Sequence, residues 1–248
     1  GSPDSGTPLV FGPNIADWPE MPPLPDHLLL KVVSFITDTV TTTDELIPSG
    51  ETASFRSNPL GLAEFTLSRK DPSYVGKAKE VRAFTKALAD GKAPGEIAPE
   101  LEEVFSALEA VPEFGAILGK SVSLASAVYA RKPGDGSARE QAASCQRVLG
   151  GGANIAEEYA TKRYRSNLIN WGMIPFVLDG EPPFSAGSWI FVPGVRQAME
   201  RGETVFPAYA AGKGSCEKIT LETGVLTEDE RAVILAGSLI NFNRKKTS

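Results

Sequence analysis

Residues 134–143 read Gly-Asp-Gly-Ser-Ala-Arg-Glu-Gln-Ala-Ala and connect two stretches of different character. The preceding stretch, residues 121–129, is apolar and rich in small residues, which predicts a strand. The following stretch, from Ser137 to about Arg147, predicts a helix. The glycines allow the backbone to turn sharply between the two. This strand–loop–helix connection is the strongest local signal in the chain.

Two interpretations of this loop stay open on the residues alone. Ser137 and Glu140 stand three positions apart, which is the spacing of a capping box, a purely structural arrangement. Alternatively, the loop places the hydroxyl of Ser137, the guanidinium of Arg139 and free backbone N–H groups at one helix N-terminus. Such a combination binds carboxylates, because the helix end favours an anion and an arginine can donate two parallel hydrogen bonds.

Outward from this loop, strand-like and helical segments alternate without a strict βαβ rhythm. This alternation predicts a mixed α/β domain with helices on one or two faces of a sheet. Residues 41–50 are polar and predict a loop. Strands are expected at residues 28–36, 153–156, 173–178, 189–192 and 219–221. Helices are expected around residues 81–90, 101–108, 158–171, 195–201 and 228–236.

The composition argues against several kinds of site. With 248 residues, 42% of them hydrophobic, and a net charge of -6, the chain is typical of a folded globular domain and not of a nucleic-acid binder. Cys145 and Cys216 stand far apart, and His27 is the single histidine. We therefore predict that this chain alone holds no metal, whether as a zinc or an iron–sulfur site, and no Cys–His nucleophile. His27 is interpreted as a structural residue rather than a member of a catalytic triad.

Apolar runs and cysteines also bear on location. Every apolar run is shorter than the ~18 residues that a membrane span needs, so we expect no membrane partner. Two cysteines without a pairing pattern fit a reducing compartment. We therefore predict a cytoplasmic location.

The first 26 residues differ in composition from the rest of the chain. Seven of the 19 prolines lie within the first 25 residues, which argues against a helix or a central strand there. We interpret residues 1–26 as a proline-rich tether and residues 27–248 as the folded domain. Extended prolyl spacers usually join two folded parts, so a partner is expected upstream.

Several segments, in the same order and with similar spacing, resemble the swivelling domain of the aconitase superfamily. Residues 135–143 resemble its Asp/Gly-x-Gly-Ser-Ser-Arg-Glu-x-Ala segment, and residues 149–175 resemble the strand and helix that follow. Upstream, residues 43–50 and Phe55-Arg56 are similar to its Thr-Asp-x-Ile-x-Pro-Ala-Gly and Phe-Arg-Gly loop. Residues 12–26 are similar to the tether that joins this domain to the main body.

The resemblance implies a fold and a set of site residues. The fold would be an aconitase-like α/β swivelling domain, a three-layer mixed β-sheet or barrel with flanking helices. Ser137 would be the catalytic serine, whose alkoxide removes the proton α to a carboxylate. Arg56 and Arg139 would bind carboxylates of the substrate, and Asp44 would orient one of these groups.

The resemblance also implies that the rest of the enzyme lies outside this chain. A 4Fe-4S cluster would act as Lewis acid, held by cysteines of a larger body: the N-terminal domains of the same protein or a large subunit. This chain would be the C-terminal substrate-binding and catalytic-base domain of an aconitase-like hydro-lyase. The substrate would be a small hydroxylated di- or tricarboxylic acid, and the isolated domain would be inactive.

Two departures from the family pattern keep alternatives open. Ala138 stands where the family has a second serine, and Ser57 follows Arg56 where the family has glycine. Both put strict citrate and isocitrate specificity in question. One alternative is a non-catalytic carboxylate-binding or regulatory module on the same fold. Another is a free-standing small subunit of an isopropylmalate-isomerase-type enzyme.

Overall fold

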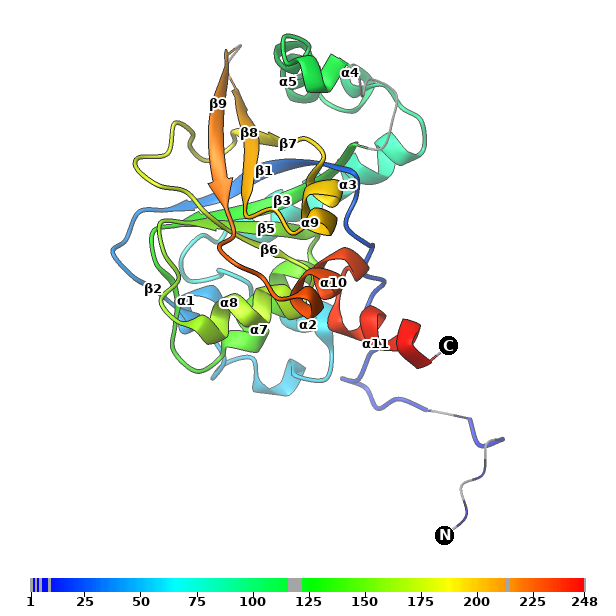
Figure 1. The fold of residues 1–248 in the computed structure, drawn as a ribbon. Helices are drawn as coiled ribbons and strands as arrows, with labels where there is room; N and C mark the ends of the chain where they lie inside the picture. The colour runs from blue at the N-terminus through cyan, green and yellow to red at the C-terminus, as the bar shows by residue number, and fades with distance from the viewer. Residues whose placement is uncertain are drawn as a thin grey trace.

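A mixed barrel forms the centre of the computed structural model, which describes residues 2, 4, 6–8, 10–115, 122–212 and 215–247. Within these residues, seven strands close the barrel in the order β1-β3-β5-β6-β9-β8-β7. The predicted α/β class and the barrel with flanking helices are confirmed (Figure 1). The strands are β1 (His27–Ile36), β3 (Val122–Ala130), β5 (Gly151–Ala156), β6 (Ile174–Val177), β7 (Trp189–Val192), β8 (Val205–Gly212) and β9 (Ser215–Glu222).

Strand β1 closes the barrel because it pairs on both sides. Leu29 lies opposite Leu124 in the parallel pairing with β3 and opposite Phe191 in the antiparallel pairing with β7. The parallel arrangement continues from β3 to β5 and β6, whereas β6, β9, β8 and β7 are joined antiparallel. One half of the barrel is therefore parallel and the other half antiparallel.

Alternate residues of β1 feed two separate hydrophobic clusters, as expected for a strand buried on both faces. Leu28, Leu30 and Val32 belong to one cluster, which includes side chains of the other barrel strands. Leu29 and Val33 belong to the other cluster, which lies against the helices that cover the barrel. The continuous apolar run of β1 thus contributes side chains to both hydrophobic clusters.

The helices cover different parts of the barrel (Figure 1). Helices α1, α2, α7 and α8 gather on one side, near the short strand β2, while α4 and α5 project beyond the barrel together with the end of α3. The elements outside the barrel are β2 (Thr41–Thr42), α1 (Thr43–Leu46), η1 (Ala53–Phe55), α2 (Pro59–Ala63), α3 (Tyr74–Ala89), α4 (Pro94–Ile97), α5 (Pro99–Leu108), α6 (Pro112–Gly115), β4 (Pro133–Asp135), α7 (Arg139–Val148), α8 (Lys162–Asn170), α9 (Val195–Arg201), α10 (Glu228–Ala236) and α11 (Leu239–Thr247).

Most predicted elements are present, and the differences have identifiable causes. The predicted bounds of β7, α9 and α10 are those observed. The prediction that residues 41–50 form only a loop is wrong, because β2 and α1 lie there. Strand β2 has two residues, too few for a periodic pattern, and it exists through its pairing with β4. Ser121, the first residue of one predicted strand, lies outside the described residues.

The end of the proline-rich segment packs on the domain. Met21 and Leu24 are buried, at 7% and 6% exposure. The Leu24 amide donates to the carbonyl of Leu235 at 3.2 Å, and Nδ2 of Asn241 donates to the carbonyl of Met21 at 2.8 Å. The leader, defined here as residues 18–25, therefore runs along α10 and α11 (Figure 1). Its role as a tether stays a prediction.

The full burial of Leu30 predicts a large loss of stability on truncation. Leu30 is 0% exposed, so Leu30→Ala should lower the free energy of unfolding by about 2–5 kcal/mol. Leu60→Ala is the matched control, because Leu60 is 46% exposed and its truncation should change stability by less than about 0.5 kcal/mol. Urea unfolding of the two variants tests this, and equal losses would contradict the burial of β1.

Candidate active site

Two predicted site segments lie side by side because β2 pairs with β4. Thr41 and Thr42 of β2 lie opposite Pro133 and Asp135 of β4, in parallel. The Thr41 amide also donates to the carbonyl of Lys132 at 3.0 Å. The loop that carries Asp44 is thereby joined to the loop that carries Ser137.

Gly136 allows these two loops to touch. Its φ is +132°, and a Cβ at this position would lie 2.2 Å from Oγ1 of Thr43. Residues that have a Cβ atom rarely adopt such a φ, and a Cβ atom does not lie this close to another heavy atom. The glycine before Ser137 is therefore required by the close approach of α1 as well as by the turn.

Tyr164 of α8 supports the same loop from the interior. A Cβ at Gly134, where φ is +98°, would lie 2.3 Å from its ring. The buried Tyr164 hydroxyl accepts hydrogen bonds from Gln146 Nε2 at 3.0 Å and Asn154 Nδ2 at 2.8 Å. Burial raises the pKa of Tyr164, so the ring stays neutral. Thr161 completes the support, because its hydroxyl donates to the carbonyl of Gly134 at 3.2 Å.

Ser137 is exposed just before α7, and its side chain is not a helix cap. The capping interpretation is wrong: α7 begins at Arg139, the N-cap residue is Ala138, and no side chain caps the helix. Glu140 instead accepts a hydrogen bond from Nε1 of Trp171 at 3.0 Å. Among the described residues, Ser137 has no hydrogen-bond partner, so its hydroxyl is available to a ligand.

Arg139 presents donors that the protein does not use. The side chain is half-buried, and its Nε atom is buried without an acceptor. Within the described part of the chain, no carboxylate forms an ion pair with Arg139. Unsatisfied buried donors are rare in folded proteins, and one next to an exposed hydroxyl is a position where a ligand would supply the acceptor. A carboxylate matches a guanidinium in shape and charge.

Asp44 lies on α1 and has a partner that the sequence did not single out. Its carboxylate forms an ion pair with Arg69 at 2.6 Å, and Glu51 contacts the same guanidinium. The pKa of Arg69 is raised, chiefly by its hydrogen bond to Glu51. The capping box of α1, formed by Thr42 and Glu45, leaves Asp44 exposed on the surface. The charge of Asp44 is thus directed at Arg69 in this structure.

Arg56 comes from a third segment and is exposed between η1 and α2. Helix α2 begins at Pro59, is capped by Asn58, and packs against α7. The amide of Ala16 donates to the carbonyl of Ser57 at 3.0 Å, so the chain ahead of the leader reaches this turn. The turn that carries Arg56 is therefore held near the helix that carries Arg139.

The remaining chemically active side chains have structural surroundings. Nδ1 of His27 accepts a hydrogen bond from the Gly194 amide at 2.9 Å, and burial lowers its pKa. Cys145 is buried, which raises its pKa to about 12, and Cys216 lies on β9. Among the described residues, no three His, Cys, Asp or Glu side chains group to hold a metal ion. In the same part of the chain, no helix is long and apolar enough to cross a membrane.

The geometry of the two loops defines a class of site. An exposed hydroxyl, an unpaired guanidinium and the N-terminal end of α7 lie on one loop, and a second loop packs against it. Such an arrangement can bind a carboxylate and hold a negative charge near the hydroxyl. The chain is therefore an α/β-barrel domain with a loop that presents a hydroxyl, a guanidinium and a helix N-terminus together.

Part of the chain is similar to known proteins of one family. Residues 123–181, from β3 to just beyond β6, match the family described as the aconitase C-terminal domain. A protein of Aspergillus fumigatus assigned as a mitochondrial aconitate hydratase is 30% identical over 117 residues, which is 46% of this chain. Over this part of its length, the chain is thus similar to the C-terminal domain of the aconitase superfamily. It spans 14% of the length of that relative.

A solved structure has the same fold. The crystal structure of 3-isopropylmalate dehydratase from Methanocaldococcus jannaschii superposes with a TM-score of 0.53 at 17% sequence identity. The similarity covers 90% of this chain and 96% of that one. Ser137 and Arg139 lie inside the segment that matches the family, whereas Asp44 and Arg56 lie before it. The roles of all four residues stay predictions.

The contact between Gly136 and Thr43 predicts that the two loops separate when a methyl group is added. Gly136→Ala should destabilise the domain more than Gly180→Ala, because Gly180 also has a positive φ, +80°, but a Cβ there would meet nothing within 4 Å. The control should lose about 1–2 kcal/mol from backbone strain alone. Denaturant unfolding measures both losses. If the two were equal, the close approach of α1 to this loop would be refuted.

Proposed function

We propose that this chain is the substrate-facing, catalytic-base domain of an aconitase-like hydro-lyase. The observation that supports this most is that one loop carries the exposed hydroxyl of Ser137 and the half-buried guanidinium of Arg139, both without partners among the described residues. Both lie in the segment that matches the aconitase C-terminal domain. The substrate class is a hydroxylated di- or tricarboxylic acid, because the site offers cations to carboxylates.

The reaction removes the elements of water from two adjacent carbon atoms of the acid. The proton α to a carboxylate moves to Oγ of Ser137, the electron pair of that C–H bond forms the double bond, and hydroxide leaves the neighbouring carbon. A serine hydroxyl is a weak base in water, so its alkoxide must be stabilised. The free N–H groups at the start of α7 and the charge of Arg139 supply this stabilisation.

The two arginines bind and orient the acid. Arg139 donates to one carboxylate from the loop, and Arg56 approaches from the turn ahead of α2. Paired N–H donors hold a planar carboxylate in one orientation, which fixes the position of the adjacent C–H bond. Asp44 is proposed to orient one of these carboxylate-binding groups, although in this structure its carboxylate pairs with Arg69 at 2.6 Å.

The group that assists the departure of hydroxide lies outside this chain. A 4Fe-4S cluster in N-terminal domains or a large subunit would supply a Lewis acid when bound there. The residues present here do not fit a cluster, because Cys145 is buried in α7 and Cys216 lies apart from it on β9. The isolated chain is therefore proposed to bind the acid without turning it over. Its two free thiols fit a reducing compartment, so we propose the cytoplasm.

Two arrangements of the parent enzyme have support. The chain spans 14% of the Aspergillus fumigatus relative, which favours a domain fused to a larger body. It covers 96% of the Methanocaldococcus jannaschii chain, which favours a separate subunit. We favour the fused form because of the proline-rich leader. Reading the gene upstream decides between them: a continuous open reading frame with a cysteine-bearing body supports fusion, and a start codon near residue 1 supports a subunit.

A non-catalytic carboxylate-binding or regulatory module is the second candidate function. Ala138 favours it, because the family's second serine is missing. In that case the complete protein would bind carboxylates through Arg56 and Arg139 and would turn over neither aconitate nor 3-isopropylmalate.

Removal of the Ser137 hydroxyl should abolish most of the activity of the complete enzyme. In Ser137→Ala, we expect kcat to fall by about 10²- to 10⁴-fold, the range for loss of a general base, with the KM little changed. Steady-state hydration assays of the complete protein measure this. Ser185→Ala, at an exposed serine in the loop between β6 and β7, is the matched control and should keep full activity. Near-normal dehydration by Ser137→Ala would remove this residue from the mechanism.

Replacement of the Arg139 guanidinium by an amine should weaken substrate binding. Lysine keeps the charge but cannot donate two parallel hydrogen bonds, so Arg139→Lys should raise KM by about 10- to 100-fold. Arg163→Lys changes an exposed arginine of α8 in the same way and should leave KM unaltered. If KM were the same in both variants, Arg139 would not contact the substrate.

A further inference from the structure

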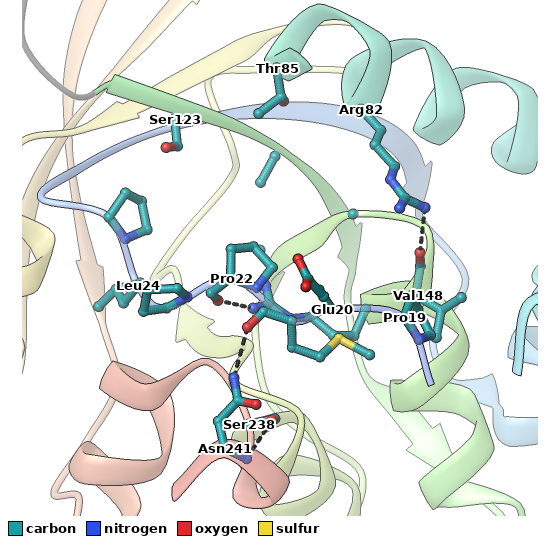
Figure 2. Close-up of a pocket in the computed structure, with 18 of the residues that line it drawn as sticks. Pro19, Glu20, Pro22, Leu24, Arg82, Thr85, Ser123, Val148, Ser238 and Asn241 are labelled. Atoms are coloured by element: carbon teal, nitrogen blue, oxygen red, sulfur yellow. Dashed lines mark hydrogen bonds between the residues drawn. The ribbon is translucent and has the colours of Figure 1, made fainter. Parts of the chain in front are cut away.

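A second site is suggested by a pocket that none of the predicted site residues lines. Its volume is about 930 Å³, within the usual range for small-molecule sites. The leader forms one part of its wall, and α3, the start of β3 and the segment from Ser238 to Arg244 form the others. In Figure 2, Thr85 and Ser123 lie on one side of the leader, and Ser238 and Asn241 lie on the other.

The charge of the pocket is opposite to that of the chain. Four cationic side chains line it, against one carboxylate, that of Glu20. The whole chain carries a net charge of -6. The cationic residues are Arg82, Lys86, Arg147 and Arg244. An acidic protein that collects cations in one hollow has a local potential that attracts anions.

Arg147 is the most deeply placed of these cations. Its guanidinium donates to the carbonyls of Pro22 at 2.7 Å, Gly151 at 3.1 Å and Gly237 at 3.2 Å. Its Nε atom is buried without an acceptor, and no carboxylate among the described residues pairs with it. Burial lowers its pKa to about 10. Carbonyl oxygens satisfy hydrogen bonds but leave the half-buried positive charge without a counter-ion among the described residues.

Arg82 and Lys86 lie one turn apart on α3 and face the same pocket. Nη1 of Arg82 donates to the carbonyl of Val148 at 3.2 Å, as Figure 2 shows. Within the described part of the chain, neither residue pairs with a carboxylate. Lys79 of the same helix is different, because it forms an ion pair with Glu64 at 2.7 Å. Arg82 and Lys86 thus face the pocket with no acidic partner among the described residues.

We propose that this pocket binds a small organic polyanion, a metabolite with at least two carboxylate or phosphate groups on a short apolar body. Arg82, Lys86 and Arg147 supply the counter-charges. The apolar part of the ligand would contact the remaining wall, which includes Leu24, Leu28, Leu124, Val148 and Ile240. Because the leader forms part of the wall, a bound anion holds the leader on the domain and slows its release.

Calorimetric titration of this chain at constant ionic strength tests the proposal, with citrate, adenosine triphosphate and inorganic phosphate as probes. We expect saturable binding of citrate or adenosine triphosphate that does not depend on Arg139. The variant Arg82→Gln/Lys86→Gln should bind at least tenfold more weakly. Lys77→Gln/Arg163→Gln removes the same charge from exposed positions outside the pocket and should bind normally. Binding of citrate alone would identify a carboxylate ligand, and binding of adenosine triphosphate with phosphate would identify a phosphate ligand.

A third variant separates this site from the candidate active site. Binding that survives Arg139→Gln but is lost in Arg82→Gln/Lys86→Gln supports the second site, whatever the outcome for the proposed hydro-lyase. Binding lost in Arg139→Gln and kept in Arg82→Gln/Lys86→Gln would overturn it, as would no saturable binding of any probe. Hydrogen exchange supplies a further readout, because the Leu24 amide, bonded to the carbonyl of Leu235, should exchange more slowly with the anion bound. An unchanged rate would contradict the link between the pocket and the leader.

Discussion

The parallel pairing of β1 with β3 places the carboxyl ends of both strands at one edge of the barrel. Ile36 lies opposite Ala130 at these ends, so the two connections that follow emerge together. One connection forms β2 and α1, and the other forms β4 and the loop of Ser137. In parallel sheets, sites form at this edge because loops from distant parts of the sequence converge there. The pairing of β2 with β4 and the contact of Gly136 with Thr43 are consequences of this register.

The Ser137 loop combines a tightly held backbone with unsatisfied side chains. Tyr164 and Thr161 hold the loop from the interior, and α1 packs against it at Gly136. The side chains of Ser137 and Arg139, by contrast, make no hydrogen bond or ion pair with the described residues. A rigid backbone that carries unpartnered polar groups is what ligand binding requires, because the protein then loses little entropy and breaks no internal bond when the ligand arrives.

Cations are distributed unevenly over the domain. Lys31 is paired with Glu80 and Glu100 between α3 and α5, and Arg69 is paired with Asp44. Arg147 instead binds carbonyl oxygens of the leader, of Gly151 at the start of β5 and of Gly237 at the end of α10. In the ion pairs, opposite charges cancel, so they join elements of the domain and add little local charge. Arg147 is half-buried and has no carboxylate partner among the described residues, so it both anchors the leader and leaves a positive potential in the adjacent pocket.

The α/β class, the bounds of β7, α9 and α10, and the loop that bears Ser137 and Arg139 follow from the amino-acid sequence. These features depend on local pattern, since periodicity, helix signals and glycines are visible over a few residues. Three-dimensional contacts were needed to distinguish the two interpretations of Ser137, to pair Asp44 with Arg69, and to place Arg147 beside the leader. They also created β2, which is too short to be seen without its partner. The physical reason is that each of these contacts joins groups distant in sequence, and only strand register and helix packing bring such groups together.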